Sequence, residues 1–114
     1  MEKIVEQGLL YDFYGELLTA HQRRIYEDVV LNDLSISEIA KEQGVTRQGI
    51  HDLVKRCDKI LEEYEAKLQL IAKFMKIGEM ASEMERLADE CVMTGDMALI
   101  HQIRRLSGEI TGTL

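Results

Sequence analysis

Hydrophobic positions recur every three or four residues along this chain, a spacing that predicts amphipathic helices. The first stripe runs through residues 2–18 and predicts a packing helix: Val5, Leu9, Phe13 and Leu17, flanked by Leu10, Tyr14 and Leu18. A second helix begins at Thr19, because Thr19 and Gln22 have the spacing of a capping box, and it buries Ile25 and Val29. Arg23 and Arg24 stand four residues before Glu27 and Asp28, a spacing that favours ion pairs. The whole pattern predicts six or seven helices.

Residues 35–55 predict a helix-turn-helix motif. Ser35 and Glu38 are spaced to cap a first short helix. Gly44 follows where the chain must adopt a positive φ to leave that helix, and Thr46 can cap the next one. Two helices crossing here would bury a shared apolar set: Ile39, Ala40, Val45, Ile50 and Leu53.

The side chains left outward on the second helix of the motif are candidates for nucleic-acid contact, since several can reach base edges or phosphates. The candidate binding residues are Thr46, Arg47, Gln48, His51, Lys55 and Arg56. Asp52 stands among them and would repel phosphates. A solvated helix face is the alternative interpretation.

Beyond the motif, apolar residues continue at heptad spacing and predict that the second helix runs far past its usual end. They are Ile50, Val54, Cys57, Leu61, Tyr64, Leu68, Ile71 and Met75. The partner of this seam is open: either the two helices that follow it or a second copy of the chain. Gly78 is a candidate break, and Gly95 and Asp96 separate two further helices before a fraying tail. We therefore expect a helix-turn-helix domain over 1–66 and a C-terminal packing or dimerisation region over 67–114.

Composition supports an all-α fold, because the chain has no proline and is rich in helix formers. Its net charge of −7 is unusual for a DNA-binding domain. Between Thr46 and Lys59, however, four cations face two carboxylates, so this stretch carries +2. Cys57 and Cys91 form no metal-binding pair and are expected to be reduced, buried thiols. No apolar run approaches the ~20 residues of a membrane span, so we expect a cytoplasmic protein without membrane insertion.

The residues indicate no catalytic chemistry. The sequence has no glycine-rich phosphate loop or nucleophile motif, and its histidines lack partners at ligand spacing. Adjacent carboxylates such as Glu62 and Glu63 diverge on a helix. We expect a non-enzyme without metal or cofactor.

The stretch LLTAHQRRIYEDVVLNDLSISEIAKEQGVTRQGIHDLVKRCDKILEEYEAKL resembles the YlxM family of helix-turn-helix proteins of Gram-positive bacteria, and the resemblance covers the full chain. Residues 17–60 are also similar to region 4 of sigma factors. The sigma resemblance implies that the helix from Thr46 enters the major groove of DNA. The YlxM resemblance implies a small cytoplasmic protein encoded beside the signal recognition particle GTPase, with a regulatory or accessory part in that secretion pathway.

These observations leave two functions open. One is a regulatory protein that binds nucleic acid, DNA in preference to RNA, and takes part in the signal recognition particle pathway. The other is a protein-interaction module whose C-terminal helices bind a second copy, giving a homodimer, or a component of the targeting pathway.

Overall fold

The computed structural model describes residues 2–114, and all regular structure in that range is helical. This confirms the predicted all-α fold. The chain divides into two compact units, Met1–Gln69 and Leu70–Leu114. The division falls slightly beyond the boundary after residue 66 that the sequence suggested.

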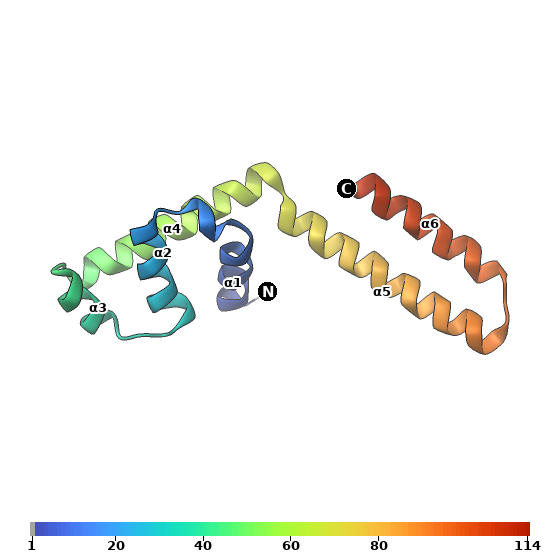
Figure 1. Cartoon of the computed structure of the whole chain (residues 1–114), viewed down its shortest axis with the longest axis horizontal. Helices are drawn as coiled ribbons and strands as arrows, with labels where there is room; N and C mark the ends of the chain where they lie inside the picture. The colour runs from blue at the N-terminus through green and yellow to red at the C-terminus, as the bar shows by residue number, and fades with distance from the viewer. Residues whose placement is uncertain (1) are drawn as a thin grey trace. The chain divides into compact units, whose positions relative to one another are not determined.

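The first unit holds four α-helices and two short irregular turns of helix (Figure 1). They are α1 (Lys3–Tyr14), the 3-10 helix η1 (Gly15–Leu17), α2 (Ala20–Tyr26), the π-helix η2 (Glu27–Leu31), α3 (Ile36–Gln43) and α4 (Arg47–Leu68).

The first helix is shorter than its apolar stripe. α1 ends at Tyr14, and the chain tightens into η1 before α2 begins. Leu10, Tyr14 and Leu18 are buried, whereas Val5 and Leu17 at the ends of the predicted stripe are half exposed. The flanking positions therefore form the core. After Tyr14, the 3-10 turn changes the direction in which Leu17 and Leu18 point, so that Leu18 and not Leu17 is buried.

The second helix begins as predicted. Thr19 and Gln22 form the complete capping box, with the Thr19 hydroxyl accepting from the Gln22 N–H at 3.1 Å and the Gln22 side chain accepting from the Thr19 N–H at 2.9 Å. The predicted ion pairs from Arg23 and Arg24 do not form within residues 2–114. Instead, Glu27 accepts a hydrogen bond from the Tyr11 hydroxyl.

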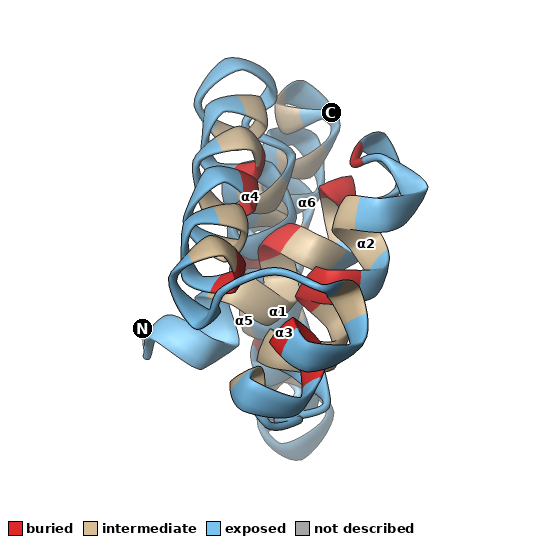
Figure 2. Cartoon of the chain, turned by 90° about the vertical axis from the view of Figure 1, so that its left-hand side faces the viewer, coloured by how far each residue is buried: buried red, intermediate tan, exposed pale blue. Residues whose placement is uncertain are grey.

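The core of the first unit lies along one side of α4, between it and the three preceding helices (Figure 2). Cys57 and Leu61 are completely buried there, together with Ile25 and Tyr26 of α2. The heptad seam of α4 is thus covered, at these positions, by helices that precede it in the chain. Neither of the two partners left open from the sequence, the later helices or a second copy, covers Cys57 and Leu61. A heptad pattern predicts which side of a helix is buried, but it does not predict which helix covers that side.

Tyrosine hydroxyls join the helices of this unit. Asp58 on α4 accepts from the Tyr26 hydroxyl at 2.6 Å and from the Gln7 side-chain amide at 3.0 and 3.1 Å. The Tyr14 hydroxyl donates to Glu65 at 2.5 Å. These bonds link α1 and α2 to α4 across the apolar core and give each buried hydroxyl the partner that burial requires.

The long helix predicted to continue through Met75 is interrupted. α4 ends at Leu68, and Gln69 adopts a left-handed conformation with φ of 54°. No glycine or proline announces this break, so the uninterrupted heptad pattern concealed it.

The second unit is a hairpin of two helices, α5 (Leu70–Thr94) and α6 (Ala98–Thr113). Gly78 lies inside α5 and does not break it. Gly95 ends α5 with φ of 70°, and the Asp96 carboxylate accepts from the Ala98 N–H at 3.0 Å, as the sequence predicted. The tail that was expected to fray belongs to α6 as far as Thr113.

One line of apolar residues joins the two helices of the hairpin. Met80 and Leu87 on α5 and Leu99 on α6 are buried. Cys91, expected to be buried, is only half buried, whereas Cys57 in the first unit is fully enclosed. Within this unit each helix packs against one other helix, so positions beside the contact line keep part of their exposure.

Candidate nucleic-acid interface

The helix-turn-helix motif is built by three local devices. The Ser35 hydroxyl accepts from the Glu38 N–H at 3.4 Å and starts α3. Gly44 turns the chain out of α3 with φ of 67°, a left-handed conformation that is costly for a residue with a Cβ. The Thr46 hydroxyl then accepts from the Gly49 N–H at 3.0 Å and starts α4. The predicted turn and the caps by the Ser35 and Thr46 hydroxyls are confirmed, whereas of the capping box predicted for Ser35 and Glu38 only the bond to the serine hydroxyl forms.

A small apolar cluster fixes the crossing of the motif. Ile39 and Ala40 of α3 and Ile50 of α4 are buried against Ile25 of α2, with Leu53 partly buried beside them. Four of the five predicted contacts are therefore present. Val45 is the exception, because it lies in the turn and half of its surface is exposed. α2 thus supports both helices of the motif, which holds α4 in a fixed direction.

The side of α4 opposite the core carries several of the predicted contact residues. Gln48, His51 and Lys55 are all exposed and lie on one face, since residues three or four apart share a side of a helix. Arg47, the first residue of α4, is exposed at the edge of this face. We call these four residues the α4 face. It contains four of the six residues proposed from the sequence.

The other two candidates have different surroundings. Thr46 is occupied as the helix cap, so its hydroxyl already accepts a bond from the backbone. Arg56 lies around the helix from the α4 face and lines a hollow of about 270 Å³ beside the turn. The hollow is also lined by His21, Gln43, Val45 and Leu53. A ligand on the α4 face would therefore meet Arg56 only if it also extended toward the turn.

The two carboxylates near the α4 face differ in exposure. The Asp58 carboxylate is only partly exposed and accepts hydrogen bonds from Gln7 and Tyr26. Asp52 is exposed, and it accepts from the Gln48 side-chain amide at 3.0 Å, which orients Gln48. The exposed charges between residues 46 and 59 are therefore four cations and one carboxylate, Asp52.

Lys59 extends the face by a further turn. It is exposed and follows His51 and Lys55 at successive spacings of four residues. Its charge was counted in the +2 of residues 46–59, but Lys59 was not among the residues predicted to contact nucleic acid. The i, i+4 spacing was the signal that would have included it.

Burial affects the titration of groups behind the face. Burial, with the neighbouring Asp58 charge, raises the pKa of the Cys57 thiol to about 11. Burial and the bond to Asp58 also raise the pKa of the Tyr26 phenol. Both groups therefore stay neutral at physiological pH.

Within residues 2–114, no three His, Cys, Asp or Glu side chains are arranged to hold a metal ion.

Residues 1–99 match the family described as "Putative helix-turn-helix protein, YlxM / p13 like" (UPF0122). The chain belongs to this family. A UPF0122 protein of Halalkalibacterium halodurans is 38% identical over 107 residues, which cover 93% of this chain and 98% of the relative. One from Bacillus pumilus is 38% identical over the same share of this chain and 97% of its own length. One from Bacillus cereus is 41% identical over 90 residues, 79% of this chain and 82% of the relative.

The helix-turn-helix of this YlxM/p13-like chain is thus supported by the family match and by the geometry of α3 and α4. Across residues 2–114, none of the helices combines the length and apolar character that crossing a membrane requires.

Proposed function

We propose that this chain is a regulatory protein that binds nucleic acid, DNA in preference to RNA, through the α4 face. The observation that carries the proposal is the exposure of Arg47, Gln48, His51 and Lys55 on the second helix of a helix-turn-helix. In such motifs the second helix lies in the major groove with its first residues against base edges.

The chemistry of the face suits that role. An arginine can donate two bonds to guanine, and a glutamine can pair with adenine. Lys55 and Lys59 stand further along α4, where helix contacts usually reach phosphates. Asp52 limits the sites that the face can bind, because its carboxylate repels phosphates but can accept a hydrogen bond from a cytosine amino group. The face therefore favours specific sites over indiscriminate phosphate binding.

The net charge of −7 limits the affinity that non-specific attraction supplies. Binding should therefore depend on correct base contacts. It should be strongest at low salt, where the attraction between the cations of the α4 face and the phosphates is least screened. The YlxM resemblance extends the proposal: the regulated process is protein targeting by the signal recognition particle, and the particle's RNA is a candidate ligand.

The test is a titration of the full chain into a randomised duplex pool and into the signal recognition RNA, at low and physiological salt. Arg47→Ala should lower affinity for a selected site by about 1 to 3 kcal/mol and relax its base preference. Lys55→Ala should weaken all sequences alike and reduce the salt slope by about one.

Arg105→Ala and Lys76→Ala are matched controls, because both residues are exposed and belong to the second unit. Neither control should change binding. Absence of binding at low salt, or equal loss in Arg47→Ala and Arg105→Ala, would refute the α4 face as a nucleic-acid reader.

The second candidate is a protein-interaction module that uses α5 and α6. It is favoured by large apolar side chains exposed at the end of the hairpin, where Val92 is 84% and Met93 85% exposed. Such a module would bind a second copy or a component of the targeting pathway. Truncation after Gln69 should then abolish association while Arg47→Ala preserves it.

A further inference from the structure

The two helices of the second unit cover each other along a single line. Met80 and Leu87 of α5 and Leu99 of α6 form this contact line, with Cys91, Leu106 and Ile110 half buried beside it. α5 and α6 run antiparallel through the short connection at Gly95 (Figure 1). Every other side of each helix lacks a neighbour within this unit.

The residue that follows each contact residue is turned by about 100° around its helix. On α5 these residues are Ala81, Ala88 and Val92; on α6 they are Ile100, Ser107 and Thr111. Both sets of residues lie on the same side of the hairpin. In two right-handed helices that run antiparallel and face each other, a step of one residue from the contact line leads to the same side on both helices. All six are exposed. We call this side the uncharged face.

The uncharged face is compatible with burial. Its α5 residues are alanine or valine, and Val92 is 84% exposed. The Thr111 hydroxyl donates to the Ser107 carbonyl at 3.2 Å, so its polar group is satisfied within the helix and its methyl group can pack. Met84 and Ile103, both half buried, extend the apolar surface toward the contact line.

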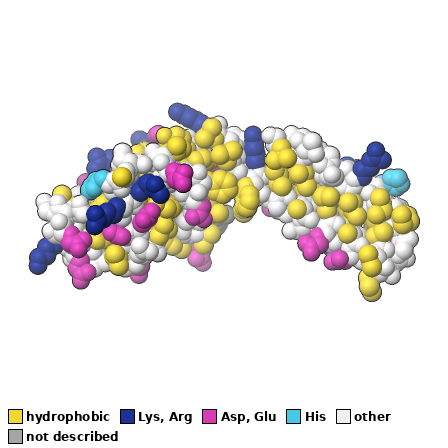
Figure 3. Space-filling model, viewed as in Figure 1, with side chains coloured by type: hydrophobic (Ala, Val, Ile, Leu, Met, Phe, Trp, Pro, Cys, Tyr) yellow, Lys and Arg dark blue, Asp and Glu magenta, His cyan; other side chains and the backbone are white. Residues whose placement is uncertain are grey.

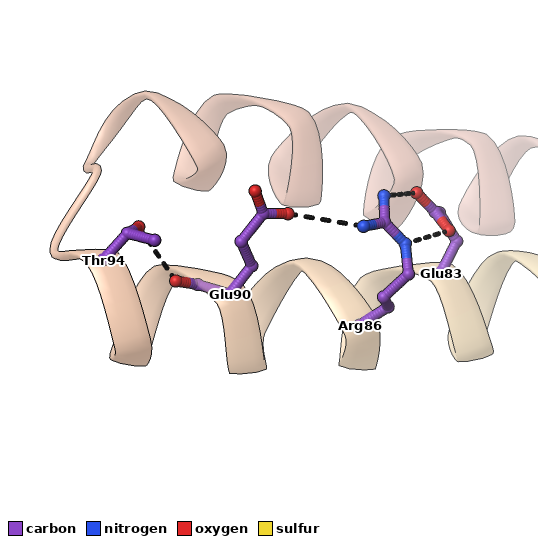
Figure 4. A network of polar contacts seen from close by, with 4 residues as sticks. All are labelled: Glu83, Arg86, Glu90 and Thr94. Atoms are coloured by element: carbon purple, nitrogen blue, oxygen red, sulfur yellow. Dashed lines mark hydrogen bonds and ion pairs between the residues drawn. The ribbon is translucent and has the colours of Figure 1, made fainter.

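The opposite side of the hairpin is charged. The residues that precede the contact positions are Glu79, Arg86 and Glu90 on α5, and Ala98, Arg105 and Glu109 on α6. Arg86 makes ion pairs with Glu83 at 2.5 Å and with Glu90 at 3.3 Å along this side (Figure 4). These bonds lower the pKa of Glu83 and raise that of Arg86. One side of the hairpin is therefore suited to water and the other to a partner.

The edges of the uncharged face carry opposite charges. Glu85 on α5 and Arg104 on α6 are exposed and lie at its two outer edges. Figure 3 shows hydrophobic side chains across the hairpin, with acidic side chains along the α5 edge and basic and histidine side chains along the α6 edge. A second copy of this surface, rotated by 180° about an axis parallel to the helices, would place its acidic edge against the basic edge of the first copy.

Such a rotation places α5 of one copy over α6 of the other. Counted along the helices at about 1.5 Å per residue, Glu85 lies about 14 Å before the end of α5 and Arg104 about 9 Å after the start of α6. The two levels differ by about 5 Å, which long side chains can span, so Glu85 can meet the partner's Arg104. The alternative, α5 over α5, would bring Glu85 and Asp89 of both copies together and is disfavoured by like charge.

The size of the face is adequate for a specific contact. α6 has 16 residues and is therefore about 24 Å long, and two helices side by side are about 20 Å wide. The face covers roughly 500 Å² per copy and about 1,000 Å² in a pair, which is near the lower limit for a specific interface.

We infer that the uncharged face binds a second copy of this chain, so that two hairpins form a four-helix bundle and the protein is a homodimer carrying two helix-turn-helix motifs. The inference rests on the second candidate function, which it makes specific, and it does not require nucleic-acid binding.

The test is sedimentation velocity of the full chain across micromolar concentrations. The wild type should sediment as two chains. Ala88→Glu places a charge in the middle of the uncharged face and should weaken dimerisation at least roughly hundredfold. Ala98→Glu is the matched control, because it adds the same charge at an exposed alanine on the charged side and should leave the dimer intact.

Charge reversal tests the arrangement independently of any folding defect in Ala88→Glu. Glu85→Arg and Arg104→Glu should each weaken the dimer, and the double variant should restore it. Circular dichroism confirms that each variant keeps its helix content. A wild type that sediments as one chain, a dimeric Ala88→Glu, or a double variant that is no tighter than the single ones would overturn the inference.

The two proposals fail separately in these experiments. A chain that dimerises but binds neither duplex DNA nor the RNA refutes the proposed function alone. A chain that binds nucleic acid but sediments as a single copy overturns the dimer alone.

Discussion

The two units of this chain differ in how completely neighbouring helices cover their apolar residues. In the first unit, α4 lies against three preceding helices, and Cys57 and Leu61 on it are completely buried. Within the second unit, α5 and α6 pack against each other along one line, and the uncharged face is exposed. Both stretches have helical periodicity in sequence. The number of neighbours, which the periodicity does not specify, distinguishes a closed core from a surface that needs a partner.

The difference also appears in the polar groups. The first unit has part-buried carboxylates that join its helices, such as Asp58, which accepts hydrogen bonds from α1 and α2. The second keeps its ion pairs on the surface around Arg86, where they contribute little to stability. Part-buried hydrogen bonds between helices therefore add directional contacts to the apolar core of the first unit, whereas the two helices of the second unit meet along an apolar line.

The largest expected effect is the loss of a core side chain in the first unit. Leu61→Ala should lower the free energy of unfolding by about 3 kcal/mol, because it removes a completely buried side chain and leaves a cavity. Leu31→Ala, at a leucine that is 41% exposed, is the control and should cost less than about 1 kcal/mol. Urea denaturation measures both. Equal costs would mean that the first unit is not closed around Leu61.

The two cysteines give the next largest contrast. Because the Cys57 thiol has its pKa raised to about 11, it should have roughly a hundredfold less thiolate near neutral pH than an ordinary thiol, and it is also enclosed. Cys91 is only half buried. A thiol reagent should therefore modify Cys91 first, by about two orders of magnitude in rate. Cys57→Ser and Cys91→Ser assign the two phases, and faster modification of Cys57 would contradict the closed core.

A smaller effect is expected from the polar tie between α2 and α4. Tyr26→Phe should cost about 1 kcal/mol near neutral pH, since it removes a buried hydroxyl bond to Asp58. A double-mutant cycle with Asp58→Ala should show a coupling of similar size in urea denaturation. Additive costs in the cycle would exclude a direct interaction.

The same tyrosine predicts a dependence on alkaline pH. Folding raises the pKa of Tyr26, so the folded chain holds this proton more tightly than the unfolded chain does. The stability that results is fully present below about pH 10, the usual tyrosine pKa, and declines as the pH rises above it. Tyr26→Phe should flatten this decline in urea denaturation. An unchanged slope would show that other groups cause it.

The smallest effects concern the turns that close α3 and α4. Gly44→Ala should destabilise the first unit by about 1 kcal/mol, because alanine is strained at φ of 67°. Gln69→Gly should have the opposite sign, stabilising the end of α4 by up to about 1 kcal/mol, since a glycine adopts φ of 54° without strain. Thermal unfolding measures both. A destabilising Gln69→Gly would mean that the glutamine side chain itself supports the break.

The sequence by itself determined the local features of this protein. The caps at Thr19, Ser35 and Thr46 and the turns at Gly44 and Gly95 were predicted correctly, because each depends on bonds within a few residues. Those signals were sufficient to identify the helix-turn-helix, to limit the candidate residues to the start of α4 and to place the family.

Only the tertiary structure decided which partner covers each stripe. It assigned the α4 seam to preceding helices, turned Asp58 inward to Gln7, a residue 51 positions away, and separated Arg56 from the α4 face. The break at Gln69 lacked a signal in the sequence because a glutamine adopts the left-handed conformation only at a cost of about 1 to 2 kcal/mol, and no glycine or proline stands there. Periodicity fixes which residues share a side of a helix; contacts between distant segments decide what that side meets.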